Sequence, residues 1–201
     1  VKRADHAAGE DEVIAPEKAI HPGQVRDINS YTLSALVEQA GGQPVRYGIV
    51  ADRFEDLYAA ANKALQECDM LVITAGSSAS VRDLTAQVVS SLGAPGVLAH
   101  GVNIRPGKPT ILAVCDGKPV IGLPGNPVSA LVVARLMVLP VIRRLLGKAG
   151  EPIAATVKAR LTINISSQAG REDWIPVKLS PSQDGFSAEP LFGKSNLIFT
   201  L

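Results

Sequence analysis

Two loops and one basic turn carry the residues whose types and spacing could bind an anion. The first loop runs from Thr74 to Asp83 and combines small residues with several hydroxyls and one acid. From it we select Gly76, Ser77 and Ser78, because small side chains let backbone N–H groups approach an anion. No Gly-Lys-Ser/Thr follows, so it is no P-loop, and it has too few glycines for a dinucleotide fingerprint. The plain alternative is a strand-to-helix turn capped by the acid.

The second loop is a short turn closed by proline at both ends. It consists of Pro124, Gly125, Asn126 and Pro127, and it follows an apolar run. Two prolines around a Gly-Asn pair predict a rigid turn whose backbone amides can donate hydrogen bonds. Such a turn suits a pterin or phosphate group that must be held in one orientation. An ordinary strand-to-helix connection is the alternative.

A basic turn supplies two cations. Arg105 and Lys108 flank a Pro-Gly pair, and two cations on a constrained turn suit an oxyanion such as phosphate or molybdate. A solvated basic loop is the alternative. Asp52 follows a predicted strand and could join the same site as an acidic group. The three histidines show no metal-ligand spacing, and His100 is left without a role.

The elements that must position these residues alternate between strand and helix. An amphipathic helix begins at Asn29 or Ser30 as its N-cap, and residues 1–24 are predicted to be a loop. The remaining predicted elements are strand 45–50, helix 54–68, strand 70–74, helix 84–92, strands 97–104, 110–115 and 118–123, and a helix over 127–146 that Pro140 kinks.

This alternation predicts an α/β fold, with three α/β/α layers and a mostly parallel sheet. Ligands bind beyond the carboxyl ends of the strands in such sheets. Asp52 and both loops follow strands, so we expect them to converge on one site. Gly147–Pro152 reads as a linker between an α/β domain at 1–147 and a small all-β domain at 151–201, with strands near 154–165, 174–179 and 186–191.

Composition excludes several classes of protein. The chain has 201 residues and a formal net charge of +1, which gives no electrostatic footprint for nucleic acid or an anionic membrane. We see no apolar run long enough to span a bilayer and no signal peptide, so we expect a cytoplasmic protein. The two cysteines, Cys68 and Cys115, lie in apolar contexts and read as core residues.

Four motifs together resemble one family. They are Gly23–Ser30, the Thr74–Asp83 loop, Arg105–Pro109 and Gly122–Ser129. In this order and approximate spacing they are similar to the molybdopterin molybdenumtransferase family, which includes MoeA and the gephyrin E domain. The resemblance covers nearly the whole chain. It implies insertion of molybdate into adenylylated molybdopterin (molybdopterin-AMP) with release of AMP, assisted by Mg²⁺, in a homodimer.

The resemblance also implies roles for single residues. Asp52 and Asp83 become the acidic residues that support Mg²⁺ and the nucleotide or pterin. Lys108 and Arg105 become the oxyanion ligands, with Lys108 in the catalytic set. Ser195 lies where the family's β domain lends a serine to the partner subunit's cleft. Pocket-shaping roles fall to Pro124, Gly125, Asn126 and Pro127.

The chain departs from the family pattern at three places. Ala75 and Ser80 replace glycines of the first loop, the family's Thr-Gly-Asp-Glu is altered to Gly9–Glu12, so that Glu12 has no assigned role, and the family's two N-terminal domains are absent. Three alternatives stay open. Val81–Thr85 resembles the Arg-Asp-x-Thr of molybdopterin adenylyltransferases. A non-catalytic molybdopterin-binding or dimerisation module is another reading, and a generic sugar- or nucleotide-binding α/β protein is the last.

Overall fold

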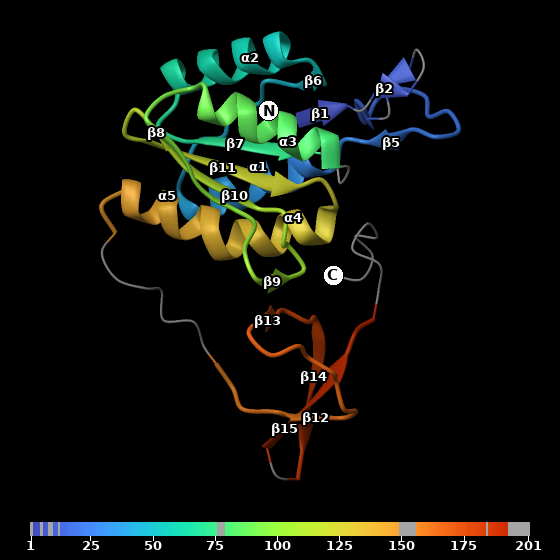
Figure 1. Ribbon diagram of the computed structural model, residues 1–201. Coiled ribbons are helices and arrows are strands. Elements are labelled where there is room, and N and C mark those ends of the chain that lie inside the picture. The colour runs from blue at the N-terminus through green and yellow to red at the C-terminus, as the bar shows by residue number, and fades with distance from the viewer. Residues whose placement is uncertain are drawn as a thin grey trace.

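A six-stranded sheet forms the centre of the molecule. The computed structural model describes residues 2–4, 6–7, 10–11, 13–75, 79–148, 156–183 and 185–192. The strand order is β6-β1-β7-β11-β10-β8 (Figure 1). Pairing is parallel from β6 to β11 and antiparallel at β10 with both its neighbours. The bounds are β1 Lys2–Ala4, β6 Ile49–Ala51, β7 Leu71–Ala75, β8 Pro95–His100, β10 Ile111–Cys115 and β11 Lys118–Pro124.

Helices cover both faces of this sheet, as the alternating pattern predicts. Helices α2 (Phe54–Glu67) and α3 (Ala79–Ser90) lie on one face, and α1 (Asn29–Ala40), α4 (Pro127–Val133) and α5 (Leu139–Leu145) lie on the other (Figure 1). Each face has its own apolar core. Neighbouring residues of β11 serve opposite cores, because Val120 packs with α2 and α3 whereas Ile121 packs with α1 and α4. The predicted three-layer α/β/α fold is confirmed.

The kink predicted at Pro140 takes the form of a π-helical turn. Ala134–Val138 widens the helix between α4 and α5, and the Leu139 N–H bonds to the Ala134 carbonyl, five residues back. Proline lacks an N–H, and its ring clashes with the carbonyl four residues earlier. A wider turn directly before Pro140 relieves that clash while the segment stays helical.

The N-terminal part of the chain differs from prediction. Residues 1–24 were expected to be a loop, yet β1 inserts between β6 and β7 in the central sheet. A strand of three residues is too short to show an alternating pattern. Two further pairs of short strands form, with β2 (His6–Ala7) against β3 (Glu10–Asp11) and β4 (Val13–Ile14) against β5 (Val25–Arg26).

The cap of α1 also differs from prediction. Asn29 or Ser30 was expected to be the N-cap, but Ile28 occupies that position and makes no side-chain cap hydrogen bond. Asp27, one residue earlier, bonds the first turn instead: its Oδ1 accepts the Ser30 N–H at 3.0 Å, and its Oδ2 accepts the Ser30 hydroxyl. Gly41 ends the helix in the left-handed conformation, at φ +93°. Asn29 is therefore released from capping, and its side chain is fully buried.

A strand-rich region follows the α/β layers. Strands β14 (Val177–Ser182) and β15 (Gly185–Pro190) form an antiparallel hairpin, and β12 (Arg160–Leu161) pairs with β15. This confirms a β-rich C-terminal part, although the strand predicted over 154–165 reduces to β12 among its described residues. In the described part of the chain, no helix combines the length and apolar character needed to cross a membrane.

Candidate functional site

The two predicted loops begin side by side. Strands β7 and β11 are parallel neighbours, with Leu123 opposite Thr74 and Pro124 opposite Ala75. Both strands therefore end at the same edge of the sheet, and the chain leaves each of them for a helix, α3 or α4 (Figure 1). Adjacent parallel strands lie about 4.8 Å apart, so the two loops start within a single ligand's reach of each other. The predicted convergence of the two loops holds at their first residues.

The Pro124–Pro127 turn is fixed from three sides. Pro124 is buried as the last residue of β11, and Pro127 occupies the first turn of α4. Asn126 adopts an extended conformation, and its carbonyl accepts the Ala130 N–H at 2.8 Å, which opens the helix. The Gly125 carbonyl accepts a hydrogen bond from the Asn29 side chain, Nδ2 to O, at 2.8 Å. The two prolines belong to β11 and α4, and hydrogen bonds to Asn29 and Ala130 hold the carbonyls of the two residues between them.

The basic turn is anchored on α4. Ile104 in β9 (Ile104–Arg105) belongs to the same core as Val133 of α4. Gly107 adopts φ +119°, and a Cβ at this position would lie 2.4 Å from Val133 Cγ2. The Thr110 hydroxyl donates to the Gly107 carbonyl at 2.6 Å. Arg105 and Lys108 are both exposed at this firmly packed turn.

The C-terminal region pairs directly with this turn. Strand β13 (Glu172–Asp173) runs parallel to β9, with Asp173 opposite Arg105. The Trp174 N–H donates to the Arg105 carbonyl at 2.7 Å, and the Glu172 N–H donates to the Asn103 carbonyl at 3.0 Å. The predicted oxyanion turn is therefore one half of a two-stranded sheet between distant parts of the sequence.

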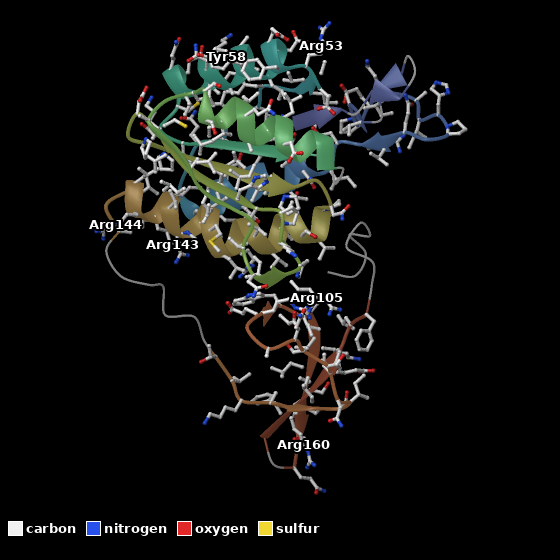
Figure 2. All side chains as sticks on the ribbon, viewed as in Figure 1. Arg53, Tyr58, Arg105, Arg143, Arg144 and Arg160 are labelled. Carbon is white, nitrogen blue, oxygen red and sulfur yellow. The ribbon has the colours of Figure 1, made fainter. Side chains whose placement is uncertain are left out.

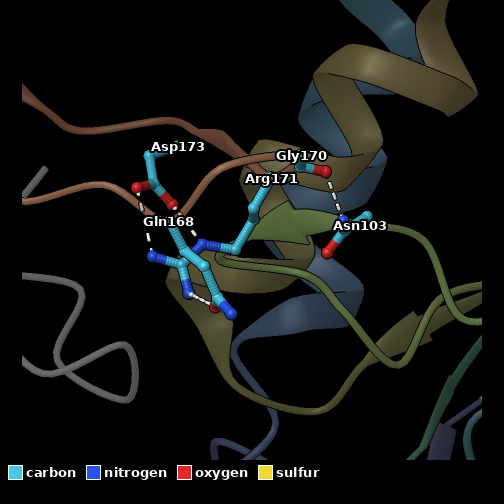
Figure 3. A network of polar contacts seen from close by, with 5 residues as sticks. All are labelled: Asn103, Gln168, Gly170, Arg171 and Asp173. Atoms are coloured by element: carbon cyan, nitrogen blue, oxygen red, sulfur yellow. Dashed lines mark hydrogen bonds and ion pairs between the residues drawn. The ribbon is translucent and has the colours of Figure 1, made fainter.

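A second arginine lies beside this junction. Arg171 holds Asp173 with two hydrogen bonds, from Nε at 2.8 Å and from an Nη atom at 3.2 Å (Figure 3). Arg171 also donates to Gln168, and the Asn103 amide reaches the Gly170 carbonyl. Hydrogen bonding by Arg171 is the main cause that lowers the pKa of the Asp173 carboxyl, and the charge of Arg105 adds to it.

Sequence reasoning missed Arg171. It lies between the strands predicted near 154–165 and 174–179, and no local pattern connects it with a segment some 65 residues away. A two-residue parallel pairing has no periodicity of its own. The cation next to a glycine was the one available signal, and it is common to many turns. Figure 2 places Arg105 near the junction of the α/β layers with β13, and Arg143, Arg144 and Arg160 away from it.

The two acidic residues differ in burial. Asp52 directly follows β6, and both its carboxylate oxygens are buried. It lies at the same sheet edge, two strands from β7, which is about 10 Å. Asp83 is exposed and lies in the second turn of α3, because that helix begins at Ala79 and not near Asp83. Among the described residues, no three His, Cys, Asp or Glu side chains form a metal-binding group.

Four predicted site residues lie outside the described part of the chain: Gly76, Ser77, Ser78 and Ser195. Glu12, which has no assigned role, also lies outside it. His100 is described and is exposed at the end of the edge strand β8. A cavity of about 530 Å³ lies elsewhere, between α1, the 42–48 segment and α5. Thr74, the first residue of the Thr74–Asp83 loop, is among the residues that line this cavity, whereas Asp52, Lys108 and Pro124–Pro127 are not.

Three helix–sheet–helix layers, with two loops that leave adjacent parallel strands at one sheet edge, define the class of the molecule as an α/β protein. Comparison with known families names the class more closely. Residues 9–144 match the family described as "Probable molybdopterin binding domain", and the chain belongs to this family.

Two curated relatives show what the chain is similar to. The chain is 39% identical to a molybdopterin molybdenumtransferase of Nostoc sp. over 142 residues, which is 69% of this chain and 32% of the relative. It is 38% identical over 157 residues to a putative molybdopterin biosynthesis protein of Methanocaldococcus jannaschii, covering 78% of this chain and 37% of the relative. The chain thus spans about a third of the length of the curated relatives it matches.

The fold of a solved structure matches that of this chain over nearly its whole length. The crystal structure of a molybdopterin biosynthesis MoeA protein from Pyrococcus horikosii superposes with a TM-score of 0.80 at 36% identity. The match covers 99% of this chain and 46% of that one. The fold and the β-rich C-terminal part are therefore those of a known arrangement.

Proposed function

We propose that this chain carries the molybdopterin-binding part of a molybdopterin molybdenumtransferase, which inserts molybdate into molybdopterin-AMP and releases AMP. One observation carries the proposal. The loop after β7 and the Pro124–Pro127 turn leave adjacent parallel strands, within a region that matches the molybdopterin-binding family. A flat pterin with a phosphate group needs donors on two sides, and two loops at one edge can supply them.

The proposed roles follow the chemistry of each group. The Pro124–Pro127 turn shapes the pterin pocket together with Gly76, Ser77 and Ser78. Arg105 and Lys108, on their anchored turn, hold molybdate close to the dithiolene that accepts it, since cations on a rigid backbone bind oxyanions with little loss of entropy. Ser195 is proposed to reach the cleft of a partner subunit.

Mg²⁺ fits the donor set that the chain offers. This ion is commonly held by one or two carboxylates, with substrate phosphates and water completing its shell. Asp52 and Asp83 are the proposed carboxylates, so no three-residue cluster is required. The ion would neutralise charge on the phosphates, while the chain's own part is to orient the ligand.

Organisation of the whole protein is part of the same proposal. We propose an α/β domain over 1–147, a β domain over 151–201, and a homodimer. Exposed apolar side chains in the β-rich part, such as Trp174, Leu179 and Phe186, support an extensive partner surface. Light scattering after size exclusion tests the dimer, and a monomer at micromolar concentration would refute it.

The decisive experiment is AMP release from molybdopterin-AMP by the full chain, with molybdate and Mg²⁺ present. We expect release that depends on molybdate, falls on chelation with EDTA, and is lost in Asp83→Ala and Asp52→Asn. Asp69→Asn is the matched control, because Asp69 is an exposed carboxylate at the opposite end of β7.

The remaining outcomes separate the alternatives. Binding of molybdopterin-AMP without AMP release identifies a binding module. Formation of molybdopterin-AMP from ATP identifies an adenylyltransferase. Absence of binding to molybdopterin and to its adenylylated form refutes the proposal.

A further inference from the structure

The cavity of about 530 Å³ lies between two segments that each lead into a strand of the central sheet. One wall is the segment 45–48, which precedes β6, and the other is 70–72, at the start of β7. Side chains of α1 and of the helical segment over 134–146 also line the cavity, and most of its exposed lining is apolar. Its two walls are thus the backbone continuations of β6 and β7.

Strand β1 explains the width of this cavity. Lys2 pairs with Ile49 of β6 and with Thr74 of β7, so β1 lies between these two strands. Neighbouring strands lie about 4.8 Å apart, which places β6 and β7 about 10 Å apart. The described part of β1 begins at Lys2, and the cavity lies beyond it, towards the N-terminal ends of β6 and β7. The space between the walls is therefore as wide as one strand.

The register of β1 continues along both walls. In parallel strands, each step along one strand matches one step along its neighbours. Back from the Lys2 pairs, the three positions that come before Val1 fall opposite residues 45–47 on one wall and 70–72 on the other. All six of these residues line the cavity. A strand that continued β1 in this register would fill it.

The first wall has the sequence of a strand. A strand is predicted over 45–50, whereas β6 begins at Ile49 and Gly48 adopts φ +78°. Glycine can also adopt an extended conformation, so Gly48 does not prevent 45–48 from joining the sheet. Val45 is 56% exposed, so its side chain is largely unpacked. The segment therefore has strand-forming residues and lacks, within the described part of the chain, a strand to pair with.

We infer that this cavity is the seat of an apolar β-strand that continues β1 on the N-terminal side of Val1. Side chains of such a strand face two apolar cores, because Leu71 of β7 belongs to the core of α2 and α3 whereas Val72 packs against that of α1 and α4. Parallel strands between two helical layers are apolar on both faces for this reason. The occupant is therefore a run of aliphatic residues in extended conformation. It belongs to the same polypeptide, because it runs directly into β1.

A strand seated in this cavity also affects the candidate site. Asp52 follows β6, the Thr74–Asp83 loop begins at the end of β7, and β1 is the strand that sets the distance between them. The described part of β1 meets β7 at one residue pair. A longer β1 adds pairs on both sides and thereby holds Asp52 at a fixed distance from the loop. This consequence rests on the proposed function, whereas the seat of the strand does not.

The test adds four residues directly before Val1 of the full chain. Val-Ile-Val-Ile supplies the apolar strand, and Gly-Ser-Gly-Ser is the matched control of equal length, because it can bury no aliphatic side chain. With the apolar extension, we expect a higher urea midpoint. We also expect hydrogen exchange about tenfold slower at backbone amides within 45–48, the equivalent of one gained hydrogen bond. The Gly-Ser extension should change neither quantity.

A third extension, Val-Ile-Asp-Ile, tests the register. Its carboxylate comes two positions before Val1 and falls opposite Leu71, which is 4% exposed, so the charge would be buried without a partner. We expect this extension to lose the gain in stability and protection. Light scattering should give the same oligomeric state for all three chains, because an apolar extension left on the surface would promote association instead.

Equal hydrogen exchange in the apolar and Gly-Ser extensions would overturn the inference. A gain that the aspartate extension retains, or that accompanies a change in oligomeric state, would overturn it as well. Binding of molybdopterin-AMP is measured on the same chains, and we expect it to be tighter with the apolar extension. If exchange slows while binding does not change, the seat stands and its link to Asp52 fails. If none of the chains binds, the proposed function fails, and hydrogen exchange still decides the seat.

Discussion

Replacing Gly107 by alanine should destabilise the protein more than the same change at any turn that is open to solvent. Gly107 adopts φ +119°, a conformation that L-residues rarely adopt. An added Cβ would lie 2.4 Å from Val133 Cγ2 and 3.0 Å from Ile104 Cδ1. Val133 is itself fully buried in α4, so it has little room to move aside.

The loss in the free energy of unfolding caused by Gly107→Ala has two parts. Forcing a residue with a Cβ into this region of backbone space costs on the order of 1–3 kcal/mol. Overpacking against a filled core adds about 1–3 kcal/mol. The expected loss in the free energy of unfolding is therefore about 2–6 kcal/mol, or most of the stability of a marginal domain at the upper end.

Urea unfolding followed by circular dichroism measures this loss, and Gly117→Ala is the matched control. Gly117 also has a positive φ, +82°, but a Cβ there meets nothing within 4 Å. Its replacement should cost only the backbone part, about 1–2 kcal/mol. The double variant Gly107→Ala/Val133→Ala should lose less than the sum of its two single changes, because the methyl group that clashes is removed.

Equal losses at Gly107 and Gly117 would refute the reasoning. That result would mean that the basic turn moves away from α4 without penalty. Strict additivity in the double variant would lead to the same conclusion, since the contact with Val133 would then carry no energy.

Single side chains elsewhere give three more expectations. Hydrogen bonds from Arg171 lower the pKa of Asp173. The stabilisation that this carboxylate provides is therefore present above its unfolded pKa and lost as the pH falls through its lower folded pKa. In urea unfolding below about pH 4, the free energy of unfolding should fall less steeply with pH in Asp173→Asn than in wild type. Lys118→Met removes two hydrogen bonds to carbonyls at the end of α2 and should lower stability by about 1–3 kcal/mol in the same assay, whereas an unchanged midpoint would show that solvent replaces the ammonium group. Burial raises the pKa of the Cys115 thiol, so Ellman's reagent should modify Cys68 first in the native protein, and equal rates would contradict the burial.

Elements with strong local signals were predictable from sequence. An Asp-Gly pair between two apolar runs is a hairpin signal, and Asp116-Gly117 connects β10 with β11, with both residues at positive φ, +50° and +82°. Pro140 predicted an irregular helix, and the π-helical turn precedes it. The apolar runs of β7 and β11 predicted two strands that each lead into a loop, and the structure adds that these two strands are parallel neighbours.

Features set by contacts between distant residues were not predictable in this way. Asparagine is a residue type that often caps helices, but the buried position of Asn29 depends on its hydrogen bond to the Gly125 carbonyl, which no local pattern reveals. The strand predicted over 45–50 shortens to Ile49–Ala51, because alternation alone does not supply a pairing partner. Helix α3 starts four residues earlier than Asp83, since small residues without apolar periodicity can still be helical.

The pairing of β9 with β13 consists largely of backbone hydrogen bonds, and this has an evolutionary consequence. Main-chain groups are the same whatever the side chain, so either strand can change its sequence without losing its partner. The β-rich part could thus have been acquired, or could diverge in sequence, while its attachment beside the basic turn persisted. Among descendants, the backbone pairing of the junction should persist where its residues have changed. Proline at Glu172 or Trp174 is the substitution that selection should remove, because each of these residues supplies a backbone N–H to the junction.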